Sequence, residues 1–124
     1  MTTKQVNKMG FGSLRVNKVN DDMAEVFVYG DIGGWMDGVD AKEFARELKA
    51  LKVTDITARI NSGGGSVFEG QAIYNSLVNH PARVNVVIDG IAASIASVIA
   101  MAGDNISITE GSHIMVHKPW SIAM

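Results

Sequence analysis

The 124-residue chain has no cysteine, which excludes disulfide bonds, thiolate metal sites and a cysteine nucleophile. It also lacks an excess of basic residues: the formal net charge is -2 and the pI is about 5.8, so nucleic acid is not a favoured partner. No apolar run approaches the roughly 20 residues that a transmembrane helix needs. The basic N-terminal residues are not followed by the apolar stretch of a secretory signal. These absences predict an intracellular protein that binds neither nucleic acid nor membrane.

The composition that remains is that of one ordinary globular domain. Hydrophobic residues make up 47% of the chain and charged residues 19%, and 124 residues can bury a modest core. Residues 1–20 are polar and weakly patterned, which predicts a flexible arm or an edge hairpin. We expect residues 21–124 to form an α/β domain.

Strands and helices are predicted to alternate along this domain. Runs rich in β-branched and aromatic residues predict strands at 23–29, 53–60 and 83–88, and two shorter ones at 106–109 and 113–117. Two capping boxes, Asp40 to Glu43 and Ser66 to Glu69, begin amphipathic helices between the first three strands. This alternation predicts β-α-β units and a mostly parallel sheet.

In the stretch from Asp89 to Gly103 the only charged residue is Asp89. The residues that follow are almost all small or apolar, so a helix formed by them would be apolar on every side. Because it is too short to span a bilayer, we predict a buried helix that ends at Gly103 as its C-cap. Ser94 then lies in the first turn, where free N–H groups and the helix dipole favour a developing anion. A hydroxyl at a strand-to-helix junction is how a nucleophilic serine is presented. The alternative is a small residue that lets the helix pack closely.

The glycine run at 63–65 does not form a nucleotide-binding loop. Gly65 and Gly70 have the required spacing, but Gln71 and Ala72 stand where lysine and a hydroxyl residue are needed. The loop is better suited to donate backbone N–H groups to an oxyanion. The alternative is a tight turn that needs glycine only for its backbone conformation.

His113 and His117 do not form a convincing metal pair. On a strand their backbones would be about 13 Å apart, at roughly 3.3 Å per residue, and no third ligand is in view. We therefore expect no metal. A histidine near a candidate serine nucleophile has another use, because activating a hydroxyl needs an adjacent base.

Three short motifs occur in a fixed order along the chain. They are Asn61 to Val67 (NSGGGSV), Asp89 to Ser94 (DGIAAS) and Met115 to Pro119 (MVHKP). Together they resemble the ClpP family of self-compartmentalised serine proteases, within the ClpP/crotonase fold, over about residues 24–119. Gly63, where housekeeping members usually have proline, and Trp120 are similar to the Clp-like proteases of phages and prophages, which are associated with capsid maturation.

The resemblance implies a role for each matching residue. Ser94 would be the nucleophile and His117 the general base. The backbone N–H groups of Gly64 and Ile95 would form the oxyanion hole.

The resemblance also implies the binding properties of the protein. Gly63 and Gly65 would belong to a loop beside which an extended peptide binds. The implied function is that of a Clp-type or ATP-independent serine endopeptidase without a cofactor, linked to capsid protein processing. The implied partners are a peptide or protein substrate, further copies of the chain, and an AAA+ unfoldase or a phage capsid protein, in the cytoplasm of a bacterial host.

One departure from the family concerns the acid of the catalytic triad. In the family it lies well downstream of the histidine, beyond a long helix, whereas this sequence ends at Met124, and neither Asp89 nor Asp104 matches it. We therefore expect the N-terminal part of a full domain, truncated after the histidine strand. Loss of a triad acid can cost about 10⁴ in rate, so this fragment is expected to be weak or inactive.

Two other functions are compatible with the pattern. The missing acid favours a non-catalytic oligomeric scaffold with a ClpP-like fold. A crotonase-like acyl-CoA enzyme would use the glycine loop to stabilise an enolate, but Ser94 together with the motif at 117–119 argues against it.

Overall fold

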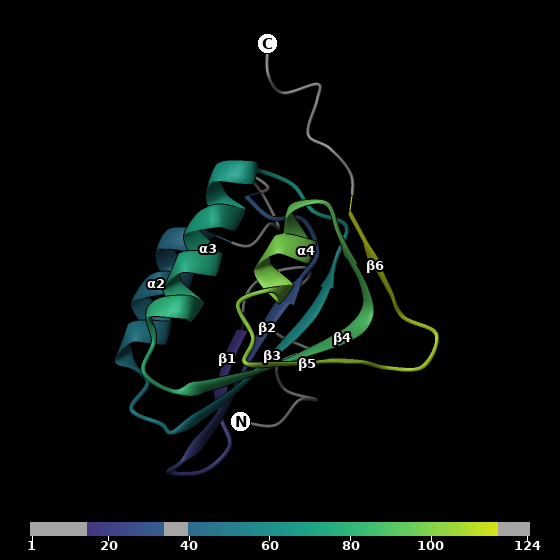
Figure 1. Cartoon of the computed structure of the whole chain (residues 1–124). Helices are drawn as coiled ribbons and strands as arrows, with labels where there is room; N and C mark the ends of the chain where they lie inside the picture. The colour runs from purple at the N-terminus through teal and green to yellow at the C-terminus, as the bar shows by residue number, and fades with distance from the viewer. Residues whose placement is uncertain (1–14, 34–39, 117–124) are drawn as a thin grey trace.

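The computed structural model describes residues 15–33 and 40–116. Over these ranges the chain forms a six-stranded sheet with its helices on one face (Figure 1). In chain order the elements are β1 (Arg15–Lys18), β2 (Met23–Tyr29), α2 (Ala41–Ala50), β3 (Asp55–Ser62), α3 (Val67–Asn79), β4 (Arg83–Ala93), α4 (Ile95–Ala100), β5 (Asn105–Ile108) and β6 (His113–Met115).

The sheet is mostly parallel, as predicted. Its strand order is β1-β2-β3-β4-β5, with β6 also paired to β4. Only β1 is antiparallel to its neighbour, and it joins β2 through a hairpin in which the Val19 N–H donates to the Met23 carbonyl at 2.8 Å. Residues 15–18, within the segment predicted as an arm or edge hairpin, thus add an edge strand, and residues 1–14 lie outside the described ranges.

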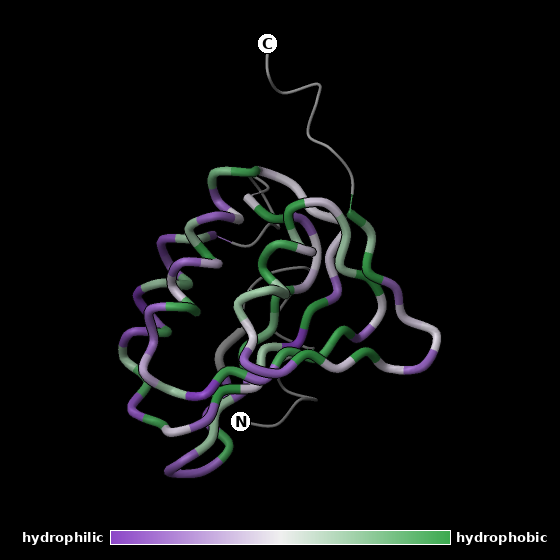
Figure 2. Tube along the Cα trace, in the orientation of Figure 1, coloured by the Kyte–Doolittle hydropathy of each residue, from purple (hydrophilic) through white to green (hydrophobic). Residues whose placement is uncertain are grey.

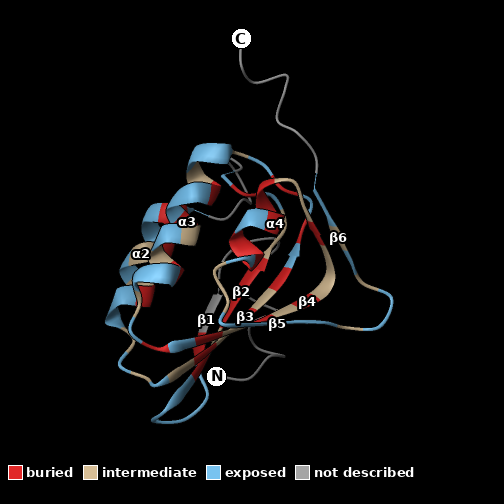
Figure 3. Ribbon diagram, viewed as in Figure 1, coloured by how far each residue is buried: buried red, intermediate tan, exposed pale blue. Residues whose placement is uncertain are grey.

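The hydrophobic core lies between the sheet and helices α2, α3 and α4 (Figure 3). Alternate residues of β3, such as Ile56 and Ile60, are fully buried, and they share the core with Phe44 and Leu48 of α2. This alternation is what a strand with one face on the core requires. Hydrophilic residues interrupt α2, whereas α4 is hydrophobic along its length (Figure 2). None of the helices in residues 15–33 and 40–116 has the length and apolarity needed to cross a membrane.

The two predicted capping boxes are present in part. The Asp40 carboxylate accepts the Lys42 N–H at 2.9 Å and caps α2, and the Ser66 hydroxyl accepts the Glu69 N–H at 3.3 Å and caps α3. The Glu69 carboxylate, however, accepts the N–H of Ala41 at 3.1 Å instead of returning to its own helix. It therefore ties the starts of the two helices together.

The predicted buried helix was wrong at both ends. β4 continues to Ala93 because its last residues pair with β6, and α4 spans only Ile95–Ala100, so Ser94 is the N-cap rather than a first-turn residue. Met101 ends the helix, not Gly103. Gly103 instead allows a close approach: a Cβ there would lie 2.7 Å from the Asn105 carbonyl oxygen.

Candidate active site

Ser94 has an unusual backbone conformation, with φ 58° and ψ -128°. It is the one non-glycine residue with a positive φ among the described residues. Such a conformation costs of order 1–3 kcal/mol and persists only where the surroundings impose it. Here the Ser94 N–H donates to the Met115 carbonyl at 3.0 Å, and the Ser94 carbonyl accepts from the Ser97 N–H at 3.0 Å and the Ser97 hydroxyl at 2.5 Å. The turn between β4 and α4 is thus held on both sides of Ser94.

The glycine loop lies directly against Ser94. Gly64 has φ +109°, and a Cβ placed there would be 2.9 Å from the Cβ of Ser94 and 3.0 Å from the Ala93 carbonyl oxygen. Any side chain at Gly64 would therefore strain the backbone and displace the serine. The half-buried Ser94 hydroxyl makes no capping bond to α4.

The other two glycines of the run differ in their constraints. Gly65 has φ +147° and forms a bridge with Ile32, so close that an added Cβ would lie 2.2 Å from the Ile32 carbonyl oxygen. Gly63 has open space where a Cβ would be, with nothing within 4 Å. Gly64 and Gly65 are required by the fold of the loop, whereas Gly63 leaves room beside it.

The two predicted oxyanion donors, the N–H groups of Gly64 and Ile95, differ in whether they already donate a hydrogen bond. The Gly64 N–H donates to the Ser62 hydroxyl at 3.1 Å, and that hydroxyl donates to the Gly30 carbonyl at 2.6 Å. The Ile95 N–H is the first of α4, one of the N–H groups that a helix leaves without an intrahelical acceptor. An oxyanion beside Ser94 would have to compete with Ser62 for the Gly64 N–H.

The strand that leads to the predicted base runs beside Ser94. β6 pairs in parallel with the end of β4, His113 opposite Ile91 and Met115 opposite Ala93. His117, the predicted base, follows two residues later and lies outside the described ranges, as does Trp120. His113 is exposed, and residues 15–33 and 40–116 contain no cluster of three or more metal-binding side chains.

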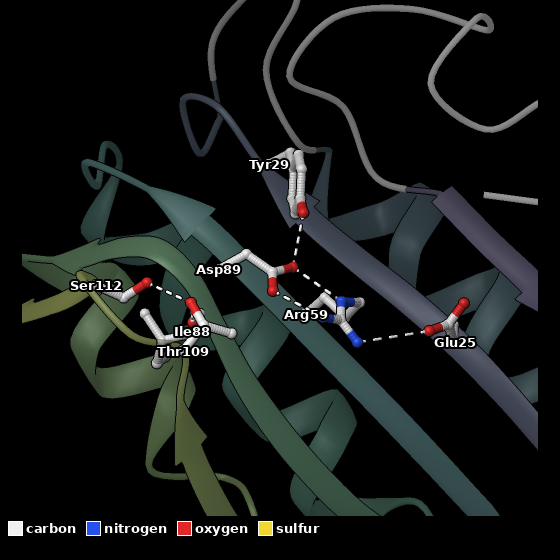
Figure 4. Close-up of polar contacts among 7 residues, drawn as sticks. All are labelled: Glu25, Tyr29, Arg59, Ile88, Asp89, Thr109 and Ser112. Carbon is white, nitrogen blue, oxygen red and sulfur yellow. Dashed lines mark hydrogen bonds and ion pairs between the residues drawn. The ribbon is translucent and has the colours of Figure 1, made fainter. Parts of the chain in front are cut away.

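Asp89 belongs to a polar cluster that sequence analysis missed (Figure 4). Its carboxylate binds the Arg59 guanidinium through two hydrogen bonds of 2.9 and 2.8 Å and accepts the Tyr29 hydroxyl at 2.7 Å. Arg59 also pairs with Glu25 at 3.7 Å. Burial, and then the bond to Asp89, raises the pKa of Tyr29 to about 12, and the bond to Asp89 raises the pKa of Arg59. Strand alternation could have placed Tyr29, Arg59 and Asp89 on one face of three neighbouring strands.

Asp104 is also committed to a structural bond. Its carboxylate accepts the Val84 N–H at 2.8 Å, and its own N–H donates to the Val84 carbonyl at 2.7 Å. These two bonds attach the segment after α4 to the start of β4. Asp89 is therefore held by other partners, and Asp104 lies at the start of β4, whereas Ser94 follows its end.

One cavity lies away from Ser94. It has a volume of about 690 Å³ and is lined by the last turns of α2 and α3 with the segments that lead into β3 and β4, among them Leu48, Lys52 and His80. Ser94 and the glycine run lie at the opposite, carboxyl ends of these parallel strands. The cavity contains none of the predicted site residues.

Comparison with known proteins places these features in a family. Residues 16–124 match the family model described as Clp protease. The chain is 37% identical over 109 residues to the ATP-dependent Clp protease proteolytic subunit of Ligilactobacillus salivarius, which covers 82% of this chain and 46% of that protein. It is 39% identical over 93 residues to the ATP-dependent Clp protease proteolytic subunit 3 of Rhodococcus jostii. That match covers 69% of this chain and 46% of that protein.

A solved structure of the same kind shares the fold. ClpP1 from Listeria monocytogenes superposes with a TM-score of 0.70 at 28% identity, covering 81% of this chain and 59% of that one. The chain spans about half the length of the curated relatives named above.

Proposed function

The chain belongs to the Clp protease family, and from this premise we propose that it carries the nucleophile and the oxyanion-binding loop of a serine endopeptidase. The observation that carries the proposal is the strained backbone of Ser94, held at a strand-to-helix turn against Gly64. A structural serine gains nothing from this conformation, whereas a nucleophile gains exposure of its hydroxyl.

In the proposed reaction the Ser94 Oγ attacks the carbonyl carbon of a peptide bond. His117 accepts the hydroxyl proton and passes it to the leaving amine, and water then hydrolyses the acyl-enzyme. The Ser94 N–H donates to the Met115 carbonyl, and His117 follows Met115 by two residues, a separation that cannot exceed about 7 Å of chain. This spacing supports His117 as the base.

The proposed oxyanion hole consists of the Gly64 and Ile95 N–H groups. Donors of this kind act when they lie about 2.7–3.1 Å from the oxyanion, and losing one typically costs 10²–10³ in rate. We propose that the Gly64 N–H leaves the Ser62 hydroxyl as charge develops on the oxygen. Ser62 keeps its bond to the Gly30 carbonyl, so the exchange leaves no polar group of Ser62 unpaired.

The substrate is proposed to be an extended peptide beside the glycine loop, joined by main-chain hydrogen bonds as in strand addition. The open space at Gly63 supports this placement. By analogy with the named relatives, we propose a homo-oligomer in a bacterial cytoplasm that acts alone or with an AAA+ unfoldase.

We also propose that the protein comes from a phage or prophage and processes capsid proteins. Residues at two sequence positions support this proposal. Gly63 replaces the proline usual in housekeeping members, and Trp120 follows the histidine motif. Because Asp89 is held in other bonds and Asp104 lies at the end of β4 opposite Ser94, we propose that the chain reacts slowly.

A fluorophosphonate probe tests the proposed nucleophile. We expect covalent labelling of Ser94, detected by mass spectrometry of its peptide, and complete loss of labelling in Ser94→Ala. Ser107→Ala, a change of an exposed serine on β5, should label like the natural chain. Equal labelling of the Ser94 variant would exclude the proposed mechanism.

A non-catalytic oligomeric scaffold is the second candidate function. The bond between the Gly64 N–H and Ser62 favours it, because a dedicated oxyanion donor would be unoccupied. A folded, assembled protein whose Ser94 never reacts with the probe would support the scaffold over the peptidase.

A further inference from the structure

The pairing of β3 with β4 is regular up to one point and then changes register. Ile60 lies opposite Ile88, and the next pair is Ser62 opposite Ala92. β3 advances by two residues over this step and β4 by four, so Asn61 alone faces residues 89–91. A bulge of this kind bends a strand and redirects the side chains that follow it. Ser94 comes three residues after the bulge.

Asn61 fills the gap that the bulge creates. Its side-chain oxygen accepts the Ile91 N–H at 3.3 Å, at the long end of the hydrogen-bond range. Gly90 packs against the same amide so closely that an added Cβ would lie 2.5 Å from the Asn61 oxygen. The backbone of Asn61 remains in the sheet, where its carbonyl accepts the Gly30 N–H at 2.9 Å. The Asn61 side chain thus replaces one ladder bond, that of the Ile91 N–H to β3.

Asp89 fixes the first residue of the bulge from the face of the sheet opposite the helices (Figure 4). Its side chain is only 14% exposed, and its paired bonds to Arg59 attach β4 to β3. The Tyr29 hydroxyl adds a bond from β2. Bidentate pairs between a guanidinium and a carboxylate are among the strongest and most directional side-chain hydrogen bonds. These bonds fix the point at which the bulge begins.

We infer that Asn61 and the Asp89–Arg59 pair are positioning residues that set the register of β4 so that Ser94 faces Gly64. A slip of one residue would turn every following side chain to the other face of the sheet. Ser94 would then lose both its contact with Gly64 and the bond of its N–H to Met115. The inference rests on the proposed function for its catalytic meaning, but the geometry can be tested without catalysis.

Amide hydrogen exchange of the 124-residue chain, resolved by NMR, tests the geometry. In Asn61→Ala we expect the Ser94 N–H to exchange about tenfold faster, the cost of a lost hydrogen bond, with Val86 unchanged. Gly90→Ala should reproduce this result, because its methyl group displaces the Asn61 amide. Asn61→Asp, which keeps the acceptor oxygen, should stay within about threefold of the natural chain.

Asn85→Ala is the matched control. Asn85 belongs to the same sheet face as Asp89, in the regular part of β4, and its side chain bonds only Asn105 among the described residues. This variant should leave Ser94 exchange unchanged. Unchanged Ser94 exchange in Asn61→Ala would overturn the inference.

Probe kinetics separate the inference from the proposed function. We expect Asn61→Ala to lower the maximal rate of fluorophosphonate labelling at least tenfold with little change in the probe concentration for half-maximal rate, because the serine is misdirected rather than the probe bound less well. If the natural chain is never labelled, the proposed function fails while the exchange result still decides the geometry. If the natural chain is labelled and Asn61→Ala reacts as fast as Asn85→Ala, the positioning role is wrong.

Discussion

The two halves of β4 follow different rules. From Arg83 to Ile88 every residue pairs in register with β3, and buried and half-buried positions alternate after the first residue. From Asp89 to Ala93 the strand bulges away from β3 and changes its partner on the other edge from β5 to β6, and Ser94, which follows it, has a positive φ. The first half contributes three buried residues to the core and the second only Ala92, and we propose that the irregular pairing of the second half directs the Ser94 hydroxyl. Local departures from regular structure are expected where function requires them.

The largest effect on stability should come from the regular half. Ile88→Ala removes a fully buried side chain and should lower the free energy of unfolding by about 2–5 kcal/mol, measured by urea denaturation. Val87→Ala, on the opposite face and half-buried, should cost clearly less. Equal costs for the two variants would show that the two faces of β4 do not differ as described.

The next effect concerns the contact between the irregular half and the glycine loop. Gly64→Ala adds a methyl group 2.9 Å from the Ser94 Cβ at a positive φ, which should cost about 1–3 kcal/mol and abolish probe labelling. Gly63→Ala is the control, because nothing lies within 4 Å of its added Cβ. Normal labelling of Gly64→Ala would mean that the loop and Ser94 are not coupled.

A smaller effect should reveal the strain at Ser94 itself. Ser94→Gly should remove the strain of the positive φ, because glycine adopts such a conformation freely, whereas Ser94→Ala should keep the strain. After subtraction of the entropy cost of glycine, the glycine variant should have a free energy of unfolding roughly 1 kcal/mol higher than that of the alanine variant. Thermal unfolding of the two variants provides the comparison. An alanine variant at least as stable as the glycine variant would contradict a strained turn.

Several of these features could be predicted from sequence. β-branched content predicted the regular half of β4, because strand alternation depends only on neighbouring residues. The order of the motifs placed Gly64 near Ser94, since parallel strands bring their carboxyl ends to one edge. Ala92 and Ala93 were assigned to a helix because their pairing with β6 is a tertiary contact that small apolar residues do not signal.

The polar cluster was missed for a related reason. Tyr29 and Asp89 are 60 residues apart in sequence, and although Asp89 begins the motif at 89–94, nothing in that motif indicates its partners. The hydrogen bond from the Gly64 N–H to the Ser62 hydroxyl was also not predicted. It depends on the side-chain rotamer of Ser62, which no sequence pattern indicates. His117 as the base stays a prediction.

The smallest effect should be the pH dependence that the cluster confers. The pKa of Tyr29 is raised in the folded state from 10.0 to about 12, so its contribution to stability is complete below pH 10 and is lost as the pH rises toward about 12. Tyr29→Phe should therefore lose stability less steeply over that window than the natural chain. Identical slopes for the two proteins in urea denaturation would remove Tyr29 from the cluster.

The most direct test of the account is a crystal structure of the chain after reaction with a fluorophosphonate. The account predicts an adduct on the Ser94 Oγ, with one phosphonyl oxygen about 2.7–3.1 Å from the N atoms of Gly64 and Ile95. The hydrogen bond between the Gly64 N–H and the Ser62 hydroxyl, now 3.1 Å, should be broken in that structure. An adduct on another residue, or one on Ser94 whose oxygens point away from both N–H groups, would contradict it.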